Sequence, residues 1–256
     1  MEAKPAIVSA SFDPFPQRET VSVAELFAAV AAEATAIADS PVVREEYAQL
    51  RTRHALPDDA GLYADYVRIR IAFEATRAGG LWGLEWRVTD RLPQSDRIWA
   101  QWRSTPVHAA ALPTTTAIAE CDELSALFAV VARGIGLSRR SQVGLFWPTS
   151  NHTVAVWVVE AQGRAPARIV VPTSQIFLDS AQSLDTDRFD PWGQKRIFDY
   201  TRRDVAADVR LPAALARHFV ARVRAHGAES RGALQTRRNR QEYEQRMAAA
   251  RESASR

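Results

Sequence analysis

The sequence predicts an α+β fold in which helical segments flank a short antiparallel sheet. Apolar residues recur at helical spacing between residues 21 and 78, which predicts an N-terminal helical layer. An apolar helix beginning at Cys121 is followed by three runs rich in β-branched and aromatic residues. A helix followed by such a meander is typical of the α+β class, whereas the α/β class alternates strands and helices.

The composition is that of an ordinary folded protein, with 256 residues of which 46% are hydrophobic and 25% charged. With the single cysteine Cys121 no disulfide can form within the chain, which favours a reducing compartment. The first apolar stretch carries Glu25 and Glu33 and follows no basic region, so it predicts neither a signal peptide nor a membrane span. As written, the chain is expected to be cytoplasmic, or exported if a signal peptide before Met1 was removed.

The net charge of +3 comes from the C-terminal segment 228–256, which holds seven arginines and four glutamates. The rest of the chain is formally neutral, whereas a nucleic-acid-binding domain needs a basic face on its folded body. We therefore expect no nucleic-acid partner. The segment 228–256 is expected to be a frayed surface helix or disordered, and it is a place where a protein partner could bind.

Four segments divide the chain. Their expected boundaries are 1–20 for an extended lead-in, 21–105 for a helical, tryptophan-rich region, 106–227 for the core, and 228–256 for the tail. Four of the seven tryptophans lie between residues 82 and 102, where they either bury apolar area in the core or line a substrate groove. The expected helices are 21–37, 42–54, 62–78, 121–134 and 212–226, and the expected strands are 142–147, 152–159 and 168–171.

The candidate chemistry centres on Cys121 and His152. A thiol attacks a carbonyl as thiolate, which a helix N-terminus and a neighbouring histidine both favour. The predicted helix begins near Cys121, although the segment Ala117-Ile118-Ala119-Glu120 could extend it backwards, and His152 opens a predicted strand farther along the chain. Alternation puts His152 on one strand face with Val154 and Val156, and we expect that face to pack against the Cys121 helix. Either residue alone is more often a packed core residue, so the order of the surrounding elements carries the prediction.

That order is a cysteine, an apolar helix, a glycine stop, a strand ending in glycine, and a strand opened by histidine. The pieces are Cys121-Asp122-Glu123-Leu124-Ser125-Ala126-Leu127-Phe128, Arg133-Gly134-Ile135-Gly136-Leu137, Val143-Gly144 and His152-Thr153-Val154-Ala155-Val156-Trp157.

These segments resemble the core of the transglutaminase-like superfamily, over roughly residues 110–180. The resemblance implies a papain-like fold in which the cysteine-bearing helix packs on an antiparallel sheet. It also implies acyl transfer or hydrolysis at an amide bond by Cys121 and His152, as in a protease, an amidase or a transglutaminase. The implied substrate is a protein or peptide, and no cofactor is implied.

One departure from the family pattern concerns the residue that orients the histidine. The family's third strand ends in Asp-x-Thr, but Val171 stands here where the aspartate is expected. Thr173 and Gln175 are the preferred substitutes, because fixing an imidazole tautomer needs an acceptor and not necessarily a charge. Ser174 and Asp179 are the remaining alternatives.

The resemblance also suggests an oxyanion site made by the backbone N–H of Cys121 with help from Gln101 or Trp102. The alternative roles of these two residues are a solvated amide and core packing. No metal site is predicted, because no histidine has metal-ligand spacing to Cys121. The alternative function is a catalytically inactive member of the same fold, which binds a partner protein through its tryptophan-rich layer or its basic tail.

Overall fold

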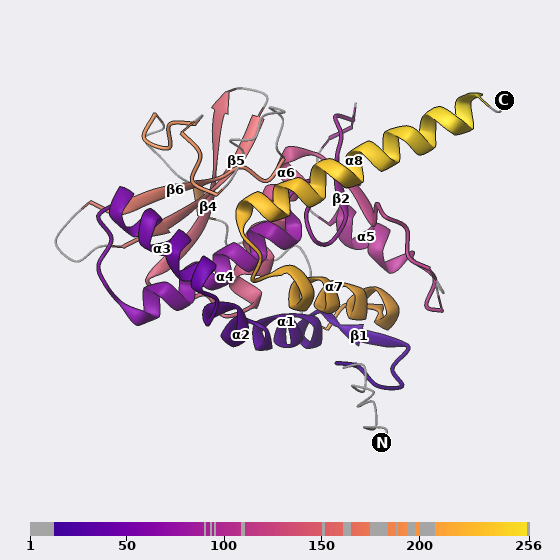
Figure 1. The fold of residues 1–256 in the computed structure, drawn as a ribbon, viewed down its shortest axis with the longest axis horizontal. Helices are drawn as coiled ribbons and strands as arrows, with labels where there is room; N and C mark the ends of the chain where they lie inside the picture. Colours follow the sequence, from indigo (N-terminus) through magenta and orange to yellow (C-terminus); the bar gives the residue numbers. More distant parts are fainter. Residues whose placement is uncertain are drawn as a thin grey trace, which may run out of the picture.

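The computed structural model describes residues 13–89, 91–92, 94, 96–108, 111–149, 152–160, 165–174, 184–187, 189–193, 198–199 and 208–254. The chain combines helices with small sheets, and the sheet strands β4 (Ser141–Thr149), β5 (His152–Val159) and β6 (Ala167–Val171) gather on one side (Figure 1). Most helices lie below or beside these strands in that view. The prediction of an α+β fold is confirmed.

The N-terminal helical layer begins after a short strand, and its helices start at recognisable capping residues. Ser22 accepts a hydrogen bond from the backbone N–H of Glu25 at 3.1 Å, and the Glu25 carboxylate accepts one from the Ser22 N–H at 2.7 Å. Asp59 caps the fourth helix by accepting from Leu62 N–H at 2.9 Å. The elements are β1 (Thr20–Ser22), α1 (Val23–Ala32), α2 (Ala34–Ala38), α3 (Pro41–Arg53) and α4 (Ala60–Thr76). The single helix expected over 21–37 is therefore two helices joined at Glu33.

The tryptophan-rich region supplies core packing. The Trp82 ring stacks on Phe219 at 4.6 Å, and Trp99 meets Trp102 edge-on at 5.1 Å. All three tryptophans are at most 1% exposed, so they bury large apolar area between the N-terminal layer and the C-terminal helices. The elements here are β2 (Leu84–Trp86), α5 (Arg97–Arg103) and β3 (Ala117–Ala119), and β2 pairs in parallel with β3.

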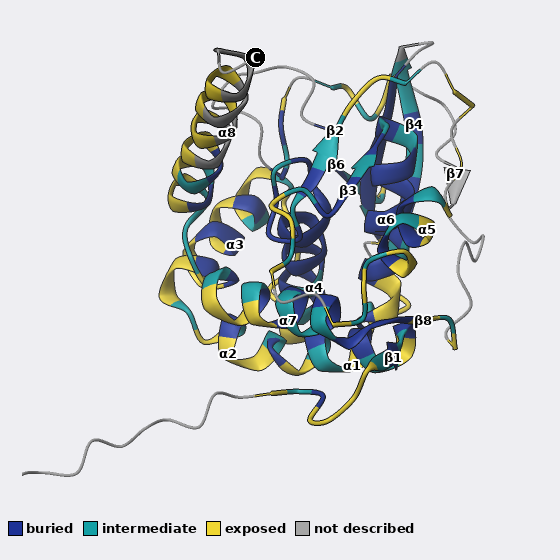
Figure 2. Cartoon of the chain, turned by 90° about the vertical axis from the view of Figure 1, so that its right-hand side faces the viewer, coloured by how far each residue is buried: buried dark blue, intermediate teal, exposed yellow. Residues whose placement is uncertain are grey.

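The helix that follows, α6 (Cys121–Gly134), packs against β4 and β5. The sheet has the order β6-β5-β4-β7, where β7 is Phe198–Asp199, and each neighbouring pair is antiparallel. The expected helix and three strands are confirmed within two residues at each end. Figure 2 shows buried residues concentrated on α4, α6 and the neighbouring strands.

The C-terminal segment returns to the start of the chain. Strand β8 (Arg210–Pro212) pairs antiparallel with β1 and leads into α7 (Ala213–His226). The tail forms α8 (Arg231–Ala254), whose beginning is buried through Leu234 and whose later part exposes Tyr243 to 64%. In Figure 1, α8 extends away from the body toward the C-terminus.

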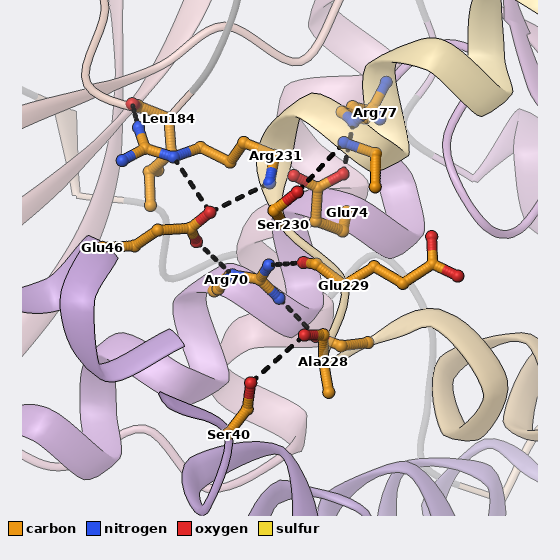
Figure 3. A network of polar contacts seen from close by, with 12 residues as sticks. Ser40, Glu46, Arg70, Glu74, Arg77, Leu184, Ala228, Glu229, Ser230 and Arg231 are labelled. Atoms are coloured by element: carbon orange, nitrogen blue, oxygen red, sulfur yellow. Dashed lines mark hydrogen bonds and ion pairs between the residues drawn. The ribbon is translucent and has the colours of Figure 1, made fainter. Parts of the chain in front are cut away.

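A buried ionic network fixes the linker between α7 and α8 to the N-terminal layer (Figure 3). Arg70 is 2% exposed, and its Nε donates to Glu46 at 2.9 Å. Its other two nitrogens donate to the backbone carbonyls of Gly227 and Glu229. Glu46 also accepts from the Arg231 N–H at 2.9 Å. The linker therefore cannot move without breaking three buried or partly buried hydrogen bonds.

Among the described residues, no single helix has both the length and the apolar character needed to cross a membrane. The segments Val23–Ala38 and Pro41–Arg53 meet these requirements only as a pair, and they are bent by 86° at their junction.

Candidate functional site

The first residue of α6 is Cys121, as the sequence predicts. Glu120 has extended backbone angles (φ −89°, ψ 174°), so the helix begins directly after it. The Glu123 carboxylate accepts from the Glu120 N–H at 3.0 Å, and Glu120 in turn accepts from the Thr89 N–H at 2.8 Å. Acidic residues in this first turn complement the positive end of the helix dipole, which holds the start of α6 in place.

The Cys121 side chain is 7% exposed, and its thiol donates to Asp122 Oδ2 at 3.6 Å. Burial is the main cause that raises the pKa of Cys121, and the Asp122 carboxylate raises it further. The backbone N–H groups of Thr153 and Asp122 act in the opposite direction on this pKa and favour the thiolate. The balance leaves a protonated thiol with two backbone donors beside its sulfur.

His152 is the first residue of β5 and is also 7% exposed. Its ring centroid lies 5.4 Å from that of Phe189. Burial lowers the pKa of His152, and the negative charge of Asp122 only partly offsets this effect. No described residue makes a hydrogen bond to the buried Nδ1 of His152, so this atom is unsatisfied within the described part of the chain.

The face of β5 that packs against α6 is not the face that the sequence predicts. Ala155 and Trp157 belong to the large core on the α6 side, whereas Val154 and Val156 form a second apolar cluster with which Phe189 packs. His152 shares the face of this second cluster, so the expectation that its face packs against α6 is not met. Both faces of the strand are apolar, and alternation alone therefore could not tell which one meets the helix.

Thr153 faces the cysteine helix in place of His152. Its hydroxyl donates to Asp122 Oδ1, while the Cys121 thiol donates to the other oxygen of the same carboxylate. Sequence reasoning did not identify Asp122 or Thr153. Their adjacency to the two candidate residues was the only signal, because each lies one position after its candidate.

The candidate third residues lie near α6 but have other partners. The hydroxyls of Thr173 and Ser125 are 3.0 Å apart, and the Thr173 carbonyl accepts from the Ala78 N–H at 2.8 Å. Ser174 is 3% exposed, and Val171 is fully buried in the large core. Gln175 and Asp179 lie outside the described residues.

Gln101 and Trp102 are held by the β3 segment. The Gln101 amide makes two hydrogen bonds of 2.9 Å to the backbone of Ile118, one as donor and one as acceptor. The indole N–H of Trp102 donates to the Thr116 hydroxyl at 3.1 Å. These contacts give both residues a structural role, fixing β3 directly before Cys121.

No group of three or more metal-ligating side chains occurs within the described part of the chain. No protein-family model, no curated protein and no solved structure gives a significant match to this chain.

Proposed function

We propose that this protein is a cysteine-dependent enzyme that cleaves or transfers the acyl group of an amide, with α6 and β4–β6 as a transglutaminase-like core. The observation that supports this most directly is the position of the sulfur. Cys121 opens α6 beside the first residues of β5, where the Thr153 and Asp122 backbone N–H groups favour the thiolate, while burial and the Asp122 carboxylate keep the pKa of Cys121 raised on balance.

In this proposal, Cys121 attacks the carbonyl, and His152 takes the thiol proton and gives it to the leaving amine. Water or an amine then releases the acyl group from the sulfur. The described contacts place the His152 ring on Phe189, on the β5 face away from α6, so the proposal requires the start of β5 to change conformation before the ring can reach the sulfur. This movement breaks no hydrogen bond to a described residue at Nδ1.

A second function, a noncatalytic module that binds a partner protein, is favoured by different contacts. Thr153 faces the cysteine helix where a catalytic histidine would be needed, and its hydroxyl bonds to Asp122. Val171 is buried where the family pattern has an aspartate. In this function, Cys121 is a small buried residue whose thiol stays protonated.

One experiment separates these two functions. The rate at which Cys121 reacts with an electrophilic peptide probe is measured between pH 5 and 9 for the wild type, His152→Gln and His108→Gln. His108 is the control because its side chain is 80% exposed and its ion-pair partner is Glu19, which is not part of the site. The enzyme proposal expects the wild type and the control to react faster than free cysteine near neutral pH, and His152→Gln to react at least about tenfold more slowly. A wild type no faster than free cysteine at every pH, with no effect of His152→Gln, supports the noncatalytic module.

A further inference from the structure

Basic side chains gather where α7 meets the start of α8. His218, Arg222 and His226 follow one another at intervals of four residues, so they share one face of α7. Arg237 approaches this face from α8, and Glu229 approaches it from the linker. The hydrogen bonds of these residues do not involve Cys121, so a role for this cluster is independent of the proposed enzyme function.

The hydrogen bonds of the cluster define the state of its central imidazole. Arg222 Nη1 lies 3.1 Å from His226 Nε2, and an arginine can only donate, so Nε2 is the acceptor. His226 Nδ1 therefore carries the proton and donates to Glu229 Oε1 at 2.9 Å. The same oxygen accepts from Arg237 Nη2 at 2.6 Å. The Glu229 carboxylate therefore contacts Arg237 and His226 directly, whereas Arg222, among the described residues of the cluster, contacts only the imidazole.

Arg222 is the less compensated of the two arginines. Burial lowers the pKa of Arg222, the charge of Arg237 lowers it further, and Glu229 offsets this only in part. The pKa of His218 is also lowered, by burial and then by the charge of Arg222. Elsewhere, the buried Arg70 contacts a carboxylate directly. Among the described residues no carboxylate lies within salt-bridge distance of Arg222, so positive charge is in excess here.

Two buried atoms of the cluster also lack partners within the described ranges. They are Arg237 Nε, which is a donor, and Glu229 Oε2, which is an acceptor. Buried polar atoms without partners are uncommon in folded proteins and call for an explanation, such as an unseen water or ion. A ligand with several acceptor oxygens and one hydroxyl would satisfy both atoms once the side chains that cover them shift.

The linker holds these groups in place. Arg70 binds the carbonyls of Gly227 and Glu229, and Figure 3 shows the Glu229 side chain extending away from Arg70. The angle between α7 and α8 is therefore fixed before any ligand arrives. The linker backbone therefore does not have to be ordered when a ligand binds, which reduces the free-energy cost of binding.

We infer that Arg222 and Arg237 form a binding site for a phosphate group, with Glu229 accepting a hydrogen bond from a hydroxyl of the ligand. Two arginine forks match the oxygens of phosphate, and its negative charge compensates the excess positive charge. Free phosphate and phosphate monoesters share this chemistry. Sulfate has a similar shape and charge but carries no hydroxyl at neutral pH, so the Glu229 carboxylate disfavours it.

The experiment measures binding of inorganic phosphate, glycerol phosphate and sulfate by isothermal titration calorimetry and by ³¹P relaxation for the two phosphorus compounds. The full-length wild type is compared with Arg222→Gln and Arg237→Gln, at constant ionic strength. Arg240→Gln is the matched control, because Arg240 is 81% exposed and lies one turn from Arg237 with the same change in charge. Circular dichroism checks that each variant is folded.

The expected result is saturable phosphate binding by the wild type and by Arg240→Gln, with sulfate at least about tenfold weaker. Arg222→Gln and Arg237→Gln are each expected to raise the dissociation constant at least about tenfold, as for loss of a charge-assisted contact. Tighter binding of glycerol phosphate than of inorganic phosphate identifies a monoester as the better ligand, and the reverse identifies free phosphate. Equal binding by all four proteins, no saturable phosphate binding, or equal affinity for sulfate overturns the inference. If Arg222→Gln does not fold, Arg237→Gln alone decides.

Discussion

Two of the regions that bury ionisable groups, the Arg70 network and the Cys121 end of α6, treat these groups differently. Arg70 is 2% exposed and remains charged, because Glu46 and two backbone carbonyls accept its hydrogen bonds. Cys121 and His152 are each 7% exposed and are neutral. Burial raises the pKa of the thiol and lowers the pKa of the imidazole.

The difference shows what a buried charge requires. A guanidinium keeps its charge inside a protein when its donors have acceptors and an opposite charge is close. At the start of α6, the carboxylate that contacts the Cys121 thiol is that of Asp122. Its negative charge opposes the formation of a thiolate. In the Arg70 network, each nitrogen of the buried guanidinium donates a hydrogen bond. At the Cys121 end of α6, the Nδ1 atom of His152 has no hydrogen-bond partner among the described residues. Buried polar atoms without a partner are uncommon in folded proteins and call for an explanation.

Removing the central arginine should show how much the closed network contributes to stability. Arg70→Met is expected to lower the free energy of unfolding by about 3–5 kcal/mol, because it leaves Glu46 buried with less compensation. The control is Arg87→Met, whose ion pair with Glu85 at 2.6 Å is exposed and should contribute less than about 1 kcal/mol. Urea unfolding at pH 7.5 measures both. Losses of similar size would mean that the linker network is not stabilising.

The sequence predicts the long elements well for a physical reason. Helices such as α6 and α7 bury a stripe at 3.6-residue spacing, and this repeat is visible over several turns. The strands β1, β2, β3, β7 and β8 have at most three residues each, which is too short for alternation to be recognised. Partners can also be distant in the sequence, as in the pairing of Thr20 with Pro212.

The candidate site was predictable only in part, because its geometry depends on packing between elements. The start of α6 at Cys121 follows from the short non-helical segment before it, and the start of β5 at His152 follows from its β-branched residues. The side of the sheet that His152 faces depends on which apolar face of β5 meets α6. That choice is made by tertiary packing of Trp157 and Ala155, which no local pattern records.

The Asp122 carboxylate offers a way to shift the second region toward a charged state. Asp122→Asn removes a negative charge that raises the pKa of Cys121, so the thiolate should form at lower pH. The rate of alkylation by iodoacetamide at pH 7.5 is then expected to rise several-fold, and the midpoint of its pH profile to fall. Asp187→Asn, at an aspartate whose side chain is 89% exposed, is the control and should change neither quantity. An unchanged profile for Asp122→Asn would show that burial alone keeps the thiol protonated.

The smallest expected effect is the pH dependence of stability that comes from His152. Its pKa in the folded protein is lowered by burial, so below about pH 6.5 the unfolded chain binds a proton that the folded chain resists. This contribution to the stability of the folded protein is fully present above the pKa that His152 has in the unfolded chain. It is lost as the pH falls from there toward the lower pKa of His152 in the folded protein. His152→Gln should therefore lose less stability than the wild type between pH 7.5 and 5.5, as measured by urea unfolding midpoints. Some dependence should remain, because the pKa of His218 is also lowered by burial.

His108→Gln, at an 80% exposed side chain, should follow the wild type. A steeper loss in His152→Gln would mean that Asp122 stabilises a charged imidazole, and the contrast between a charged and a neutral buried region would then fail.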